Sequence, residues 1–105
     1  MHNISVDEAK VVLDTKDGTI FLDVRTPGEY GRGKIEGSIN VPVDQVAGSI
    51  AAAIPDRSKK IIAYCLSGSR SDLAALELHQ LGYANAFSMT HGLLEWRAKK
   101  YPLVP

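Results

Sequence analysis

The stretch "KKIIAYCLSGSRSDLAALELHQLG" (residues 59–82) joins a strand-like run to a helix-like run through a short turn. Residues 59–65 are apolar between a pair of lysines and a cysteine, which predicts a buried strand. Residues 70–82 have apolar side chains at helical spacing and a glycine placed to end the helix. The predicted buried face of this helix consists of Leu73, Ala74, Leu78 and Leu81.

The remainder of the chain repeats this alternation of strands and helices. Ser5 and Glu8 form a capping-box signature at the start of the first predicted helix. Further strands are predicted at 19–24, 38–42 and 85–89, and further helices at 5–15, 43–54 and 93–101. Strands that are apolar on both faces and alternate with helices predict a parallel sheet covered by helices.

Length and composition limit the possible functions. A chain of 105 residues is expected to form one domain, residues 1–105. Apolar residues make up 45% of it, and 12 basic side chains balance 12 acidic ones, so we expect no nucleic-acid partner. We expect no membrane partner either, because no apolar run is long enough to span a bilayer. The start of the chain lacks the pattern of a secretory signal, so we expect a cytoplasmic protein.

A single cysteine excludes an internal disulfide, and three scattered histidines lack the spacing of metal ligands, so no metal site is expected. In parallel sheets ligands bind at the carboxyl ends of strands, and Cys65 falls at such an end, as does Asp23. Gly68 allows the loop after Cys65 to curl and point backbone N–H groups inward, and the following helix adds its positive dipole end. Arg70 adds a formal charge. These features predict a nucleophilic thiolate beside an anion site, although a free cysteine can also serve as a small buried apolar residue.

Four segments resemble the single-domain rhodanese family, in the order and roughly the spacing of that family. "LDVRTPGEY" (22–30) resembles its Asp-x-Arg…Glu-Tyr/Phe segment, and "GKIEGSINVP" (33–42) resembles its Gly-His-Ile-x-Gly-Ala-x-Asn signature. "YCLSGSRS" (64–71) resembles the active-site loop, and "MTHGLLEWRAKKYPLVP" (89–105) the closing Gly-Gly-x-x-x-Trp segment. The resemblance implies a small α/β domain with a central, mostly parallel sheet of four to five strands and helices on both faces.

The resemblance also implies a sulfurtransferase. Cys65 would attack the outer sulfur of a donor, such as thiosulfate or a persulfide, and become a persulfide. It would then pass that sulfur to a thiol, a protein or cyanide, without a metal or an organic cofactor. The implied substrate-binding loop consists of Leu66, Ser67, Gly68, Ser69 and Arg70.

The sequence departs from the family pattern at several positions. Leu66 stands where the family often has a basic residue, which favours a donor less anionic than thiosulfate. Lys34 replaces a histidine, and His91 replaces a glycine in the closing segment, where it either contacts substrate or is an exposed loop residue. Asp23 and Arg25 are also candidates for the pocket lining. Their structural alternative has Arg25 pair with Glu29 while Asp23 accepts backbone N–H groups of the turn.

Other functions compete with this interpretation. Cysteine phosphatases and arsenate reductases use a Cys-x5-Arg loop, whereas Cys65 and Arg70 are separated by four residues. A thiol–disulfide oxidoreductase would need a second cysteine. A non-catalytic rhodanese-like binding or regulatory module, and a dedicated sulfur-relay carrier for one partner protein, remain alternatives.

Overall fold

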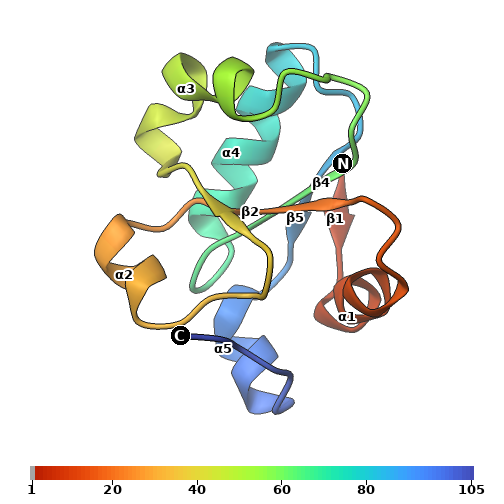
Figure 1. The fold of residues 1–105 in the computed structure, drawn as a ribbon, viewed down its shortest axis with the longest axis vertical. Helices are drawn as coiled ribbons and strands as arrows, with labels where there is room; N and C mark the ends of the chain where they lie inside the picture. The colour runs from red at the N-terminus through yellow and green to blue at the C-terminus, as the bar shows by residue number, and fades with distance from the viewer. Residues whose placement is uncertain (1) are drawn as a thin grey trace.

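All strands of the central sheet run parallel. The computed structural model describes residues 2–105. Its sheet has five strands in the order β1-β5-β4-β2-β3 (Figure 1). The strands are β1 (Asn3–Ile4), β2 (Ile20–Asp23), β3 (Ile39–Asn40), β4 (Ile61–Tyr64) and β5 (Ala86–Met89). Each neighbouring pair is parallel, which confirms the predicted α/β class.

Helices cover both faces of this sheet. They are α1 (Val6–Thr15), α2 (Pro27–Gly31), α3 (Val46–Ala53), α4 (Ser69–Gln80) and α5 (Gly92–Ala98), with a 3₁₀ turn at Val43–Gln45. Helices α3 and α4 pack on one face, and α1 and α5 pack on the other (Figure 1). The short helix α2 follows the end of β2. No helix among residues 2–105 is long and apolar enough to cross a membrane.

The pleat of β4 divides the core into two clusters. Ile61, Ala63 and Cys65 join the cluster under α3 and α4, whereas Ile62 and Tyr64 join the cluster under α1 and α5. Successive side chains of a strand point to opposite faces, so this alternation follows from strand geometry. It places the Cys65 side chain on the sheet face that α4 covers.

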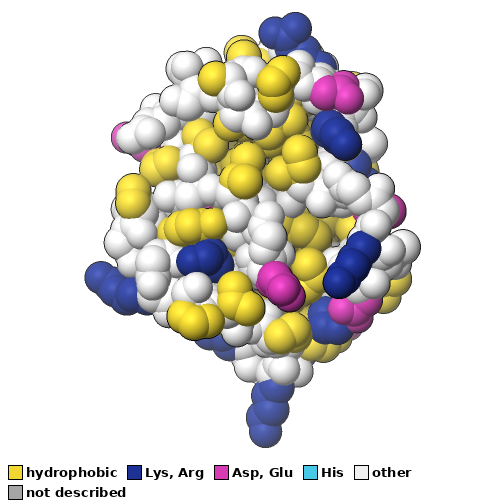
Figure 2. Space-filling model, viewed as in Figure 1, with side chains coloured by type: hydrophobic (Ala, Val, Ile, Leu, Met, Phe, Trp, Pro, Cys, Tyr) yellow, Lys and Arg dark blue, Asp and Glu magenta, His cyan; other side chains and the backbone are white. Residues whose placement is uncertain are grey.

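The predicted buried face of α4 is partly wrong. Ala74, Ala75 and Leu78 are buried, but Leu73 is 63% exposed. The N-cap of the helix is Gly68, whose φ of +110° lies in the left-handed region. Leu73 lies about 200° around the helix from Ala75 and about 140° from Leu78, so it points away from the face that these two residues bury. Apolar side chains gather on the part of the surface where α3 and α4 lie (Figure 2).

Two helices begin with capping boxes. The predicted box at Ser5 and Glu8 is present at the start of α1. A second box, in which Thr26 and Glu29 cap each other's backbone N–H groups, starts α2, which was not among the predicted helices. Satisfying these amides fixes where each helix begins. For α2 this also fixes the position of Glu29, which faces the cysteine loop.

Candidate active site

Cys65 directly follows β4, and its side chain is fully buried. Its Sγ accepts a hydrogen bond from the backbone N–H of Gly68 at 3.1 Å. The Cys65 thiol also donates to the Ser71 hydroxyl oxygen at 3.8 Å. The sulfur therefore lies beside a backbone donor and a hydroxyl, at the N-terminal end of α4.

Helix α5 holds the cysteine loop from outside. The N–H groups of Leu93 and Leu94 donate to the carbonyls of Cys65 and Leu66, both at 3.0 Å. This approach requires Gly92, because a Cβ at that position would lie 2.5 Å from each of the same two carbonyl oxygens. The backbone of the loop is thus fixed by the closing segment of the chain as well as by α4.

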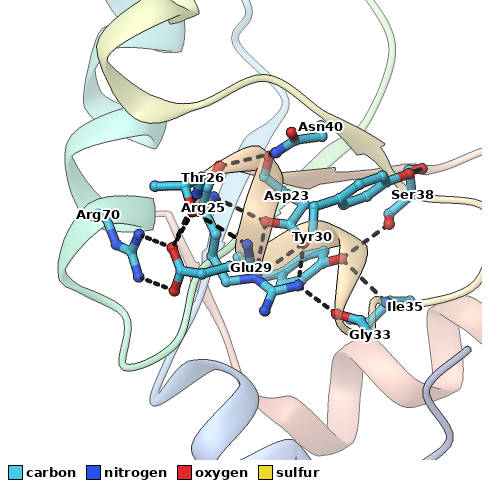
Figure 3. A network of polar contacts seen from close by, with 11 residues as sticks. Asp23, Arg25, Thr26, Glu29, Tyr30, Gly33, Ile35, Ser38, Asn40 and Arg70 are labelled. Carbon is cyan, nitrogen blue, oxygen red and sulfur yellow. Dashed lines mark hydrogen bonds and ion pairs between the residues drawn. The ribbon is translucent and has the colours of Figure 1, made fainter. Parts of the chain in front are cut away.

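Arg70 is engaged by Glu29 of α2. The guanidinium and the carboxylate form two contacts of 2.7 and 3.1 Å (Figure 3). The hydrogen bond from Arg70 lowers the pKa of Glu29 to about 2, and the same bond raises the pKa of Arg70. The charge of Arg70 is therefore largely neutralised. The expected pair between Arg25 and Glu29 is wrong, because Glu29 reaches across to Arg70 instead.

Arg25 and Asp23 form a buried ion pair at the end of β2 (Figure 3). The Asp23 carboxylate accepts hydrogen bonds from Nε and Nη2 of the Arg25 side chain. It also accepts one from the Arg25 backbone N–H at 2.9 Å. Arg25 Nη2 donates further to the carbonyl of Gly33 at 2.6 Å. These contacts fix the turn after β2 and tie it to the next loop. Each side chain is hydrogen-bonded to the other and to a backbone group. This agrees with the structural alternative for Asp23, in which its carboxylate accepts backbone N–H groups of the turn.

The other two candidates lie at different distances from the loop. Lys34 is half-buried, with Nζ 4.4 Å from the ring centroid of Tyr30, and its backbone pairs with Val104. His91 is exposed and has a φ of +65° just before α5. It shares a shallow cavity of about 280 Å³ with Ser67, Gly68 and Ser69. His91 is therefore beside the cysteine loop, whereas Lys34 belongs to the neighbouring loop of the second segment.

The loop residues themselves differ in exposure. Ser67 and Ser69 are exposed, Leu66 is half-buried and Gly68 is buried. Among residues 2–105, no group of three or more His, Cys, Asp or Glu side chains is placed to hold a metal ion.

Sequence reasoning missed three polar residues behind the cysteine. Ser71 and Ser88 are buried and hydrogen-bonded to each other at 2.8 Å, and Ser88 donates to Asp72 at 2.6 Å. Ser71 lies in the first turn of α4, where its hydroxyl donates to the carbonyl of Gly68 at 3.0 Å. Nothing in the sequence links Ser88 to the cysteine, because the pairing of β5 with β4 brings it there.

Known proteins share this fold. Residues 5–99 match the model of the rhodanese-like domain. A tRNA uridine(34) hydroxylase of Yersinia enterocolitica is 30% identical over an alignment of 102 residues, and the match covers 93% of this chain but only 29% of that protein.

Solved structures that are similar to this chain also include rhodanese-related proteins. A rhodanese-related protein of Thermoplasma volcanium has a TM-score of 0.84 at 31% identity, and covers 99% of this chain and 98% of its own. A thiosulfate sulfurtransferase of Pseudomonas aeruginosa has a TM-score of 0.89 at 25% identity, over 99% of this chain and 20% of its own. The chain belongs to the rhodanese-like domain family.

Proposed function

We propose that the protein is a sulfurtransferase that carries a sulfane sulfur on Cys65 as a persulfide. The observation that carries this proposal is the hydrogen bond from the Gly68 N–H to Sγ at 3.1 Å, made where β4 meets the start of α4. A thiolate stabilised there is a nucleophile, and the same donor suits the persulfide anion that replaces it. Membership of the rhodanese-like family supports the proposal, as does the similarity to a thiosulfate sulfurtransferase.

The reaction proceeds in two displacements. The Cys65 thiolate attacks the outer sulfur of the donor, a new S–S bond forms, and the old bond to that sulfur breaks. The electron pair of the broken bond leaves with the departing thiolate or sulfite. An acceptor nucleophile, such as cyanide or a thiolate, then attacks the outer sulfur of the persulfide. The Cys65–sulfur bond breaks with its electron pair on Cys65, so the enzyme thiolate is restored.

The charges around the cysteine favour a donor less anionic than thiosulfate. Leu66 adds no charge to the loop, and Arg70 is already paired with Glu29. A dianion entering this loop would lose hydration, and the guanidinium of the loop, Arg70, is already paired with a carboxylate. We therefore propose a low-molecular-weight persulfide as donor and a thiol or a protein thiol as acceptor. Because the chemistry needs a reduced thiol, we propose the cytoplasm as its compartment.

Turnover assays test this proposal. Thiocyanate formation from cyanide is followed with thiosulfate and with glutathione persulfide, for the wild type and Cys65→Ser. We expect activity that is lost in Cys65→Ser and a larger kcat/KM for the persulfide. A larger kcat/KM for thiosulfate would refute the donor assignment. A folded protein that turns over neither donor would be a binding module instead, and transfer to only one protein acceptor would identify a relay carrier.

A further inference from the structure

A chain of hydroxyl groups leads from the buried thiol of Cys65 to the protein surface. It runs from Sγ to the Ser71 hydroxyl at 3.8 Å, to the Ser88 hydroxyl at 2.8 Å and to the Asp72 carboxylate at 2.6 Å. Cys65 and Ser71 are fully buried and Ser88 is 1% exposed, whereas Asp72 is exposed. The chain thus connects a group without solvent contact to a carboxylate in water.

The donors and acceptors along this chain are ordered in one direction. Ser88 donates its proton to Asp72, so its oxygen is free to accept from Ser71. The Ser71 oxygen can in turn accept from the thiol. The single Ser71 proton has two acceptors, since Ser71 Oγ also lies 3.0 Å from the Gly68 carbonyl. When the Ser71 hydroxyl rotates so that its proton points to Ser88 and not to Gly68, the hydrogen bonds form a continuous path from the thiol to Asp72.

The thiol has one hydrogen-bond acceptor within residues 2–105. Gly68 offers Sγ an N–H, which donates and cannot take a proton. The Ser71 oxygen is the acceptor. Two ion pairs engage charged side chains at this end of the sheet, because Arg70 pairs with Glu29 and Arg25 pairs with Asp23.

Two further titratable groups face the loop from packed elements. His91 is exposed and lies beside Gly68, at the start of α5, and Asp72 is the carboxylate at the end of the hydroxyl chain. Ser71 is thus the residue to which the fully buried thiol donates its hydrogen bond.

We propose that Ser71, Ser88 and Asp72 are positioning residues that conduct the Cys65 proton to solvent when the persulfide forms. This inference rests on the proposed sulfurtransferase function. The thiol proton moves to Ser71 Oγ while the Ser71 proton moves to Ser88 and the Ser88 proton moves to Asp72. The electron pair of the S–H bond stays on sulfur and attacks the donor. Asp72, being exposed, then releases its proton to water.

The variant that separates conduction from structure is Asp72→Asn. Asparagine keeps an oxygen that accepts from Ser88, but it cannot take up a proton. Glu77→Gln removes the same charge from the same helix without touching the hydroxyl chain, so it serves as the matched control. Ser88→Ala interrupts the chain, and Ser88→Thr restores the hydroxyl with a residue that strands accommodate.

Single-turnover persulfide formation is measured by intact mass with glutathione persulfide over a range of pH. At a pH where Cys65 is mostly thiol, we expect Asp72→Asn and Ser88→Ala to be slower than the wild type by at least about tenfold. At a pH where Cys65 is already thiolate, both should match the wild type, because no proton has to leave. Glu77→Gln should follow the wild type at every pH, and Ser88→Thr should recover part of the rate that Ser88→Ala loses.

Two results would overturn the relay while leaving the proposed function intact. Asp72→Asn rates equal to the wild type at every pH would show that the proton takes another route. An equal loss at every pH would assign these residues a purely structural role. A wild type that forms no persulfide would instead refute the proposed function itself.

Discussion

Replacing Gly92 by alanine tests how α5 holds the cysteine loop. Gly92 has a φ of +56°, and a Cβ there would lie 2.5 Å from the carbonyl oxygens of both Cys65 and Leu66. The obstacles are backbone atoms rather than the flexible end of a side chain. The helix and the loop must therefore move apart, which lengthens the hydrogen bonds that Leu93 and Leu94 donate to the same carbonyls.

The expected cost follows from these contacts. A non-glycine residue in the left-handed region costs about 1–2 kcal/mol. Weakening two backbone hydrogen bonds adds roughly 1 kcal/mol for each. We expect Gly92→Ala to lower the free energy of unfolding by about 3–4 kcal/mol, a large part of the roughly 5–15 kcal/mol typical of a domain. The matched control is Gly48→Ala in the interior of α3, where a Cβ meets nothing within 4 Å. That change should stabilise the protein by about 0.5–1 kcal/mol.

Urea unfolding of the two variants and the wild type gives the comparison. Single-turnover persulfide formation under conditions where Gly92→Ala is still folded shows whether the loop has moved, and we expect it to be slower. A loss of less than about 1 kcal/mol for Gly92→Ala, within the range of an ordinary surface substitution, would refute the reasoning.

Three further predictions concern charge at the site. The lowered pKa of Glu29 means that its pair with Arg70 stabilises the fold above the ordinary carboxyl value of 4.5, and that this contribution is lost as pH falls toward about 2. Glu29→Gln should therefore be less stable than the wild type by up to about 1 kcal/mol at neutral pH, and urea unfolding should show the gap closing in acid; a gap independent of pH would contradict this. Asp23→Asn leaves the Arg25 charge buried without its partner, so unfolding should show a loss of about 3–5 kcal/mol, and a loss below about 1 kcal/mol would count against the pair. Leu66→Arg should raise kcat/KM for thiosulfate severalfold at low salt and less at high salt, whereas an unchanged value would show that loop charge does not select the donor.

The elements around the cysteine were predictable because strong local signals define them. The apolar run 59–65 contains β4, and the helix predicted at 70–82 is α4, Ser69–Gln80. The two-residue strand β1 is too short to produce a periodic pattern, and it exists only by pairing with β5. Helix α2 was overlooked although its sequence holds a readable signal, because Thr26 and Glu29 have the spacing of a capping box.

The candidate site shows the same division between local and distant information. The position of Cys65 at a strand end and the bend at Gly68 follow from neighbouring residues. The partners of charged side chains do not follow from neighbouring residues. Glu29 pairs with Arg70 of α4 and not with Arg25, which is nearer to it in the sequence. Ser88 enters the site through the parallel pairing of two strands, which one sequence does not reveal.

The most direct test of the account is the mass of the protein after reaction with a donor. Reduced wild type and Cys65→Ser are incubated with glutathione persulfide, and intact mass is recorded before and after cyanide is added. The account predicts that the wild type gains one sulfur atom, that cyanide removes it, and that Cys65→Ser gains none. A folded wild type whose thiol is alkylated readily but gains no sulfur from this donor or from thiosulfate would contradict it.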